Sequence, residues 1–229
     1  MSLLEFIKKS PKAELHLHIE GTLEPEQMLT LAKRNNIQIP FKNINEAKNA
    51  YNFSNLESFL KIYYEGAKVL IKEQDFFDLT WAYALKCKEN NIVHTEIFFD
   101  PQTHTDRGIN FDIVINGIYK ALQKAEKEFD LSFKIIMCFL RHLDEDAGFK
   151  ILGQAIVHKD KIFGVGLDSS EMGNPPSKFE KLFKKAAENN FITVAHAGEE
   201  GPPEYMWEAL NLLNVKRIDH GVQCLKDEK

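Results

Sequence analysis

The sequence predicts an α/β fold, a (β/α)8 TIM-type barrel of which the 229 residues cover about six strands. Short apolar runs alternate with longer amphipathic segments along the whole chain, the pattern of strands that lie beneath helices in a parallel sheet. Polar side chains stand at the carboxyl ends of these runs, where the strands of a barrel converge on one face. An open doubly wound sheet is the alternative, in which such side chains are spread along a line.

Each expected strand is an apolar run that ends in or near polar residues. The expected strands lie within 11–21, 93–100, 133–140, 162–168, 192–196 and 217–222. Apolar residues at helical spacing predict the helices 25–36, 56–71, 74–90, 111–129, 145–158, 176–189 and 203–213. The segment 41–53 is polar and is expected to be a loop. Asparagine pairs and Pro101 are expected to end several of these elements.

Composition argues against several classes of partner. The chain has 29 Lys and Arg against 34 Asp and Glu, whereas nucleic-acid binding requires a basic surface. No run approaches the roughly 20 apolar residues that span a bilayer, and residues 1–12 lack the apolar core of a secretory signal. The three cysteines are widely spaced and do not suggest a disulfide framework. We expect one catalytic domain over 1–229 in a cytoplasmic protein, with no nucleic-acid or membrane partner.

The first expected strand carries two histidines two residues apart. Side chains at this spacing on a strand point to the same face, so His16 and His18 should lie together. Leu15, Leu17 and Ile19 should pack on the opposite face. Two imidazoles on one face can bind a single metal ion, most often zinc. The alternative is a strand that merely carries two polar residues.

Two later strands also end in histidines. His196 ends the fifth strand and completes a three-histidine set with His16 and His18, which suits a catalytic zinc that keeps one position open for water. Glu199 follows three residues later and is a candidate general acid or base, or else a solvated loop charge. His220 ends the sixth strand and could be a metal ligand or a base that orients water.

The remaining histidines give weaker signals. His104 is expected on a loop above the active face and His142 just after the third strand, where each could touch a substrate. His94 opens a strand at the opposite end, and His158 ends a helix. Both are expected to be structural or exposed.

Three motifs together resemble those of a known family. The runs Glu14–Gly21, His196–Glu199 and His220–Gly221 resemble the motifs of the adenosine and adenine deaminases of the amidohydrolase superfamily. The resemblance extends along the whole chain, and it implies a barrel of the metal-dependent hydrolase kind. It also implies a small-molecule purine substrate, with hydrolytic deamination that releases ammonia in purine salvage.

The resemblance assigns roles to the residues of these motifs. His16, His18 and His196 would bind one Zn²⁺ ion per chain. Glu199 would protonate the ring nitrogen next to the attacked carbon, and His220 would orient and help to deprotonate the attacking water. Zinc lowers the pKa of bound water from about 15.7 toward about 7, which makes a nucleophile available at neutral pH.

Three acidic residues bear on which purine is bound. In the nucleoside-specific members an aspartate that contacts the ribose stands where Glu20 lies, and the longer side chain would extend into the ribose space. The run that begins at Asp168 and ends at Glu171 resembles the adenine deaminases. Glu171 could accept the N9–H of free adenine, which adenosine lacks. The resemblance therefore implies adenine; a deaminase of adenosine or of a modified 6-aminopurine is the alternative.

The family's last strand supplies a pair of aspartates in a Ser-Asp-Asp-Pro context, of which one ligates zinc. No such pair follows Gly221 in this sequence. We therefore expect a barrel without its last two strands and without the fourth metal ligand. The alternative of another class is a non-catalytic remnant that binds zinc or purine. The sequence leaves the oligomeric state open.

Overall fold

The structure is a computed structural model that describes residues 2–227. The chain divides into two compact units. The first comprises residues 1–52, 61–99 and 103–134, and the second comprises residues 53–60, 100–102 and 135–229. The expectation of a single catalytic domain over 1–229 stays a prediction.

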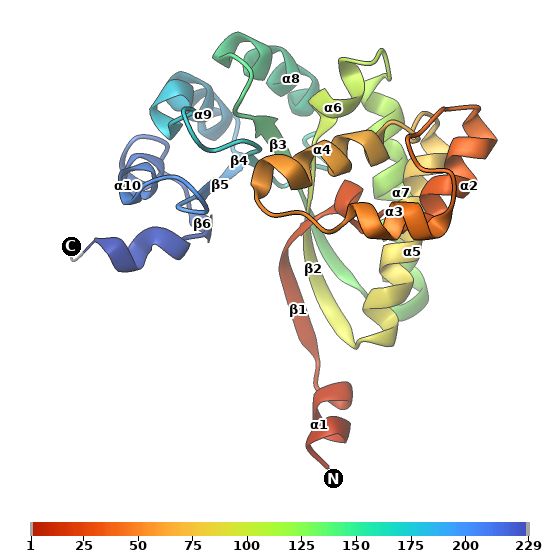
Figure 1. Cartoon of the computed structure of the whole chain (residues 1–229). Coiled ribbons are helices and arrows are strands. Elements are labelled where there is room, and N and C mark those ends of the chain that lie inside the picture. Colours follow the sequence, from red (N-terminus) through yellow and green to blue (C-terminus); the bar gives the residue numbers. More distant parts are fainter. Residues whose placement is uncertain (1, 228–229) are drawn as a thin grey trace. The chain divides into compact units, whose positions relative to one another are not determined.

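The first unit is built on two parallel strands, β1 (Lys12–His18) and β2 (Ile92–Phe99), with Glu14 opposite Thr95 and His18 opposite Phe98. Its helices are α1 (Leu3–Lys9), α2 (Pro25–Asn35), α3 (Ile44–Ala50), α5 (Glu73–Glu89) and α7 (Phe111–Phe129), with a 3-10 turn η1 (Ile19–Thr22). Helices α5 and α7 pack against each other (Figure 1). The buried residues of α5 include Phe76, Leu79, Tyr83 and Cys87, which recur at intervals of three and four residues. One face of the helix therefore packs into the core.

The second unit contains most of β3 (Ser132–Leu140) and all of β4 (Gly164–Asp168), β5 (Ile192–Ala197) and β6 (Arg217–His220). Its helices are α8 (Glu145–Val157), α9 (Glu180–Glu188) and α10 (Pro203–Asn211), with 3-10 turns η2 (Pro176–Phe179) and η3 (Val222–Lys226). Two helices, α4 (Leu56–Ala67) and α6 (Pro101–Thr105), have residues in both units. Of the two predicted catalytic residues, Glu199 lies in the turn after β5 and His220 is the last residue of β6.

The strand order decides between the two predicted architectures. The six strands follow one another in the order β1-β2-β3-β4-β5-β6, and each pairing with a described register is parallel. A doubly wound sheet reverses its strand order at a switch point, whereas a (β/α)8 barrel keeps the order of the chain. The order therefore confirms the α/β fold class with barrel-type topology.

Strand β1 departs from strict alternation. Between Glu14 and Leu17 its register against β2 shifts, because three residues of β1 span two of β2. The expectation that Leu15 packs opposite the histidines is wrong, since Leu15 is 44% exposed. An extra residue in a strand changes which face the following side chains occupy.

Several helices differ from the expected elements. The segment 41–53 contains α3 instead of a loop, because the Asn43 side chain accepts the Glu46 N–H and caps the helix (2.9 Å). The expected helix 176–189 divides into η2 and α9. Helices α1 and α6 were not expected, and α1 begins with a capping box between Ser2 and Glu5.

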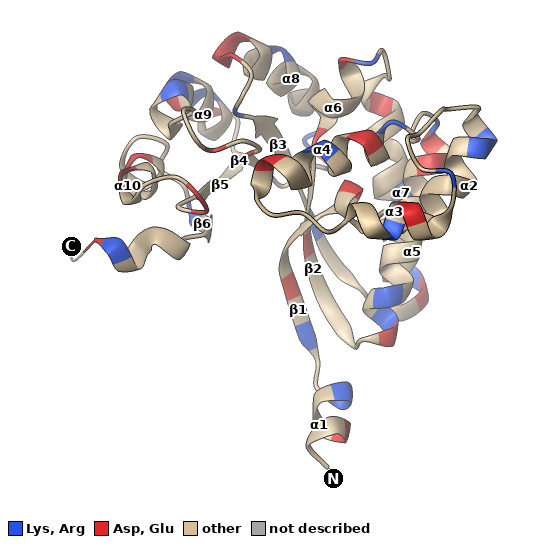
Figure 2. Ribbon diagram, in the orientation of Figure 1, with Lys and Arg blue, Asp and Glu red and all other residues tan. Residues whose placement is uncertain are grey.

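Acidic and basic residues are interspersed on most helices of each unit (Figure 2), which agrees with a chain of nearly balanced charge. Among the described residues, none of the helices has the length and apolar character that crossing a membrane requires.

Candidate functional site

His16 and His18 lie together on β1, as their spacing predicts. Their ring centroids are 5.9 Å apart, and both rings contact Phe98 of β2, at 5.3 and 4.9 Å between centroids. The edge of the Tyr63 ring faces His18 at 6.5 Å. The neighbouring aromatic rings limit the orientations that the two imidazoles adopt.

Glu20 belongs to a buried polar network just beyond β1. Its carboxylate accepts hydrogen bonds from Tyr63 Oη (3.2 Å) and His104 Nε2 (3.0 Å), and the residue is 3% exposed. Arg107 donates to His104 Nδ1 at 2.9 Å. Since a guanidinium only donates, Nδ1 of His104 must accept and Nε2 must carry the proton. The expectation that His104 lies on a loop is wrong, because it belongs to α6, where its side chain is fully buried between Glu20 and Arg107; its contact with a substrate stays a prediction.

His196 is the next-to-last residue of β5 and is 4% exposed. Its Nδ1 lies 3.0 Å from the carbonyl oxygen of Leu167 on β4. A carbonyl only accepts, so Nδ1 carries the proton and the neutral ring has its lone pair on Nε2. A histidine that binds metal through Nε2 has this arrangement.

His220 and Glu199 meet at the carboxyl end of the second unit's strands. His220 Nε2 lies 3.4 Å from Glu199 Oε2, and the His220 ring centroid is 5.1 Å from that of His196. The backbone of His220 has a φ of +74°, in the left-handed region that non-glycine residues rarely adopt. Residues held in such conformations concentrate at functional sites, so this observation favours a functional role for His220.

Asp168 ends β4 and is 3% exposed, opposite Leu140 in the parallel pairing. The next residue, Ser169, also has a positive φ of +76°, and its hydroxyl lies 2.9 Å from Nδ1 of His142. Ser169, directly after β4, therefore has a left-handed backbone like that of His220 at the end of β6. The substrate contacts expected of Asp168 and His142 stay predictions.

Glu171 is 1% exposed and its carboxylate faces the backbone of the following strand's loop. Oε1 accepts the Gly198 N–H at 2.7 Å, and Oε2 accepts those of Glu199, Glu200 and Gly201 at 3.0, 2.8 and 2.7 Å. Three backbone donors therefore share Oε2, which has two lone pairs, and one donor binds Oε1. The predicted bond from Glu171 to adenine N9–H stays a prediction, but it would compete with these donors.

Glu199 lines a cavity of about 420 Å³ within the second unit. Phe53 and Phe59 form an aromatic part of its wall, with ring centroids 5.0 Å apart. Leu56 donates its backbone N–H to Glu200 Oε1 at 3.1 Å and thereby ties this wall to the loop that follows β5. Cavities of this size with aromatic walls and a few polar groups are typical of small-molecule sites.

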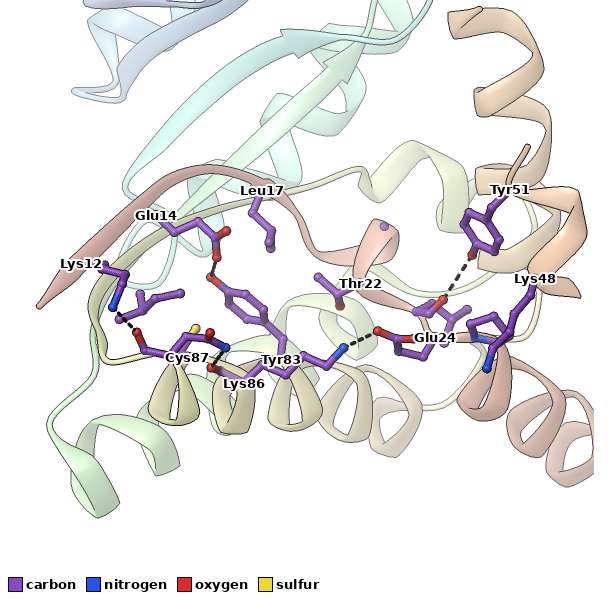
Figure 3. A pocket seen from close by; sticks show the side chains of 15 residues that line it. Lys12, Glu14, Leu17, Thr22, Glu24, Lys48, Tyr51, Tyr83, Lys86 and Cys87 are labelled. Atoms are coloured by element: carbon purple, nitrogen blue, oxygen red, sulfur yellow. Dashed lines mark hydrogen bonds and ion pairs between the residues drawn. The ribbon is translucent and has the colours of Figure 1, made fainter. Parts of the chain in front are cut away.

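A larger cavity, of about 730 Å³, lies in the first unit between β1 and α5 (Figure 3). Tyr83 lies at its centre and bonds Glu14 Oε2 and Thr95 Oγ1, each at 2.6 Å. Burial, with help from Cys87 and Glu14, raises the pKa of Tyr83 above its usual range. None of the predicted site residues lines this cavity, so we assign the cluster to packing between β1 and α5.

Comparison with known proteins places these motifs in a family. The sequence profile of the adenosine deaminase family matches residues 11–229, which is nearly the whole chain. The chain belongs to the adenosine deaminase family. An adenine deaminase from Acinetobacter baylyi is 61% identical over 227 residues, covering 99% of this chain and 68% of that protein.

Solved structures agree with the fold of this adenosine deaminase family member. The crystal structure of an adenine deaminase from Arthrobacter aurescens superposes with a TM-score of 0.93 at 48% identity, covering 95% of this chain and 67% of that one. An amidohydrolase from Burkholderia ambifaria, described with bound Zn, superposes with a TM-score of 0.88 at 25% identity, covering 99% and 64%. These matches confirm the predicted fold class.

The structure of this family member adds a residue whose role the sequence did not reveal. Arg141 directly follows β3 and is fully buried. Its Nε donates to the Asn174 carbonyl and its Nη1 to the His196 carbonyl, each at 2.8 Å. Burial lowers the pKa of Arg141, and the nearby Glu171 and Asp168 carboxylates oppose that effect. An arginine at the end of a buried apolar run is the signal that could have drawn attention to it.

Proposed function

We propose that this protein catalyses zinc-dependent hydrolytic deamination of adenine to hypoxanthine and ammonia, a reaction of purine salvage. The observation that carries the proposal is the 3.4 Å contact between His220 and Glu199, because Glu199 also lines the aromatic cavity of the second unit. A purine fits the size and wall chemistry of that cavity. The adenine deaminases of Acinetobacter baylyi and Wolinella succinogenes, 61% and 60% identical to this chain, support adenine as the substrate.

The metal proposal assigns His16, His18 and His196 as ligands of one zinc ion. The tautomer of His196 fits this role, since its Nδ1–H is bound to the Leu167 carbonyl and its Nε2 has the lone pair. The two histidines of β1 also fit, because their rings lie 5.9 Å apart on one strand. These three imidazoles would hold the zinc ion, which would lower the pKa of a bound water toward about 7 and so provide a nucleophile at neutral pH.

The remaining steps are assigned to side chains of this chain. Glu199 delivers a proton to N1 of the purine ring, which makes C6 more electrophilic toward water. His220 Nε2 receives a proton from that water and lies within reach of Glu199 Oε2 at 3.4 Å. After water adds at C6, the proton held by His220 passes to the amino group, which leaves as ammonia. The proton of the new hydroxyl returns to the Glu199 carboxylate, so a 6-oxo group remains and both residues regain their starting protonation. In this proposal Glu199 exchanges protons with the purine ring, and His220 exchanges protons with water and the leaving amino group.

Selection of adenine over adenosine is assigned to the buried acids. Glu20 is held by His104 and Tyr63, so its carboxylate is fixed in place. A fixed carboxylate at the position where the nucleoside-specific members carry a shorter acid leaves less room for a ribose. We propose that Glu20 and Asp168 line the substrate's side of the site. The N9–H acceptor role of Glu171 is tested separately below.

The test measures ammonia and hypoxanthine formed from adenine by the purified, zinc-loaded protein. We expect turnover of adenine, little turnover of adenosine, about one zinc per chain, and loss of activity when a chelator removes the metal. Glu199→Gln should lower kcat at least about 100-fold, since it removes a general acid. Glu204→Gln, an exposed change on α10, is the matched control.

Either of two results would overturn the proposal. The first is absence of ammonia release by folded, zinc-loaded protein. The second is a kcat/KM for adenosine that equals the value for adenine, which would leave the reaction class standing and transfer the substrate assignment to nucleosides.

A further inference from the structure

We propose that Glu171 is a positioning residue, which holds the 198–201 loop and thereby sets the location of the Glu199 carboxylate. This inference rests on the proposed function, because it assigns Glu171 a task in the reaction that Glu199 performs. It replaces the expected contact between Glu171 and adenine N9–H. All the contacts that support it lie within the second unit.

The loop itself is shaped to bind an anion. Four successive backbone N–H groups, from Gly198 to Gly201, converge on the two oxygens of Glu171 at 2.7 to 3.0 Å. Successive N–H groups that point into one concavity form a nest, an arrangement that binds anions. In this protein the anion is an internal carboxylate. Gly198 makes the arrangement possible, because its φ of +67° belongs to the left-handed region.

Residues outside the 198–201 loop also hold the segment that carries Glu171. Asn174 donates its N–H to the Glu171 carbonyl at 3.0 Å, which closes a turn around this residue. Arg141 donates from Nε to the Asn174 carbonyl and from Nη1 to the His196 carbonyl. One buried cation therefore joins the turn that carries Glu171 to the strand end that carries His196. Its charge also compensates a buried anion, since Glu171 is among the groups that stabilise charged Arg141.

Neighbouring side chains lie very close to two glycines of the 198–201 loop. A Cβ built on Gly201 would lie 2.7 Å from Cδ and Oε1 of Glu171, and one on Gly198 would lie 2.7 Å from Sδ of Met206. Both distances are shorter than real contacts allow. The loop can approach the carboxylate this closely only because Gly201 lacks a side chain, whereas the close contact at Gly198 is with the end of the flexible Met206 side chain. Gly201 therefore belongs to the same arrangement as Glu171, and Gly198 contributes its left-handed backbone.

The consequence for the reaction is geometric. Glu199 donates its own N–H to Glu171. The backbone from which the reacting Glu199 side chain extends is therefore held in place. Misplacing a general acid by about 1 Å can cost on the order of 100-fold in rate. Loss of the Glu171 charge should therefore lower kcat, with little change in the binding of adenine. An N9–H acceptor would behave differently, because its removal should chiefly raise KM.

The experiment compares wild type, Glu171→Gln and Glu208→Gln by amide hydrogen exchange of the zinc-loaded protein, followed by kinetics with adenine. Glu208 is the matched control, since its Oε2 accepts a single backbone N–H, from Ser177 at 2.9 Å, in the same unit. We expect the 198–201 amides to exchange at least tenfold faster in Glu171→Gln, because each of these N–H groups would lose a charged acceptor, which binds more strongly than a neutral one. The amides of β5 should stay protected, and kcat should fall at least tenfold with KM within about twofold.

Unchanged exchange at 198–201 in folded Glu171→Gln would overturn the inference, as would a raised KM with unchanged kcat. Equal loss of protection throughout β5 would also overturn it, since the residue would then be a general stabiliser. If Glu171→Gln does not fold, Glu171→Asp gives the same readout with the charge kept and the reach shortened. Exchange needs no turnover, so wild type that releases no ammonia would contradict the proposed function and leave this test valid.

Discussion

Asp75 in the first unit and Glu171 in the second are both buried carboxylates that accept hydrogen bonds from backbone N–H groups. Asp75 Oδ2 accepts from Ile71 at 2.9 Å and from Lys72 at 2.8 Å, at the start of α5. Its remaining donors are side chains of α2, Arg34 and Asn35. Glu171 accepts from four backbone amides of one loop and, among the described residues of its unit, from no side chain.

The difference separates two uses of the same chemistry. Asp75 joins α2 to the start of α5, so its hydrogen bonds contribute to the packing of helices in the first unit. Glu171 serves a single loop, and that loop contains a proposed catalytic residue. We therefore expect the loss of Asp75 to appear mainly in the stability of the protein, and the loss of Glu171 mainly in turnover.

The largest expected effect on stability is that of Asp75→Asn. Removing a buried charge that holds Arg34 and two backbone N–H groups should lower the free energy of unfolding by about 2 to 3 kcal/mol. The measurement is urea unfolding, followed by circular dichroism. The matched control is Asp78→Asn, because Asp78 binds the same Arg34 at 2.6 Å but its side chain is 34% exposed. An exposed pair of this kind is worth about 1 kcal/mol or less.

The comparison predicts that folded Asp75→Asn keeps the kcat of wild type for adenine. A drop of tenfold or more in kcat, at a temperature where the variant remains folded, would show that Asp75 also influences the reaction. The distinction between the two carboxylates would then fail.

The next largest effect is expected from Gly201→Ala. The added methyl group would collide with the Glu171 carboxylate and with the Tyr205 ring, each at 2.7 Å, so the loop must shift. We expect a loss of about 1 to 3 kcal/mol in stability and a lower kcat. Gly153→Ala on α8 is the control, since a Cβ there meets nothing within 4 Å and alanine favours a helix by about 0.5 to 1 kcal/mol. A Gly201→Ala variant with normal kcat would contradict the role of close packing around Glu171.

Sequence reasoning succeeded where a local rule decides the outcome. The spacing of His16 and His18 placed their rings together, and apolar runs predicted all six strands of the described part of the chain. The polar residues at strand ends marked where chemistry concentrates. Each of these inferences depends on the periodicity of one segment, which the sequence displays directly.

Contacts between distant segments were beyond this reasoning. The four amides that bind Glu171 lie 27 to 30 residues away, and nothing local indicates that a carboxylate would accept them. His104 was expected on a loop above the active face, and its burial against Glu20 was missed because these residues become neighbours only in the folded chain. The bulge in β1 likewise depends on pairing with β2. Partner choice over long separations is a tertiary property, and a single sequence does not display it.

A smaller effect is expected from pH. Burial alone would raise the pKa of Asp75, but the N–H groups of Lys72 and Ile71 and the Arg34 guanidinium lower it overall. A carboxyl with a lowered pKa in the fold stabilises the protein above its unfolded pKa of about 3.9, and that contribution is lost as the pH falls through the folded value. The stability gap between wild type and Asp75→Asn should therefore be constant from pH 7 to 5 and shrink below about pH 4. Urea unfolding at pH 7 and pH 3 measures it, and a gap that widens on acidification would contradict the assignment.

The finest test uses the cysteines as reporters of each unit. Cys87 lies on α5, the helix whose first turn contains Asp75, and burial raises the pKa of its thiol to about 11. Cys138 is buried on β3 in the second unit, and Cys224 is exposed. Since the thiolate is the reactive form, labelling of a buried thiol at pH 8 requires local opening. Asp75→Asn should therefore speed labelling of Cys87 about tenfold or more, with Cys138 unchanged and Cys224 labelled at once in every variant. The labelling rates are measured by mass spectrometry. If Asp75→Asn accelerated labelling of Cys87 and Cys138 equally, the two units would open together, and the influence of Asp75 would not be confined to its own unit.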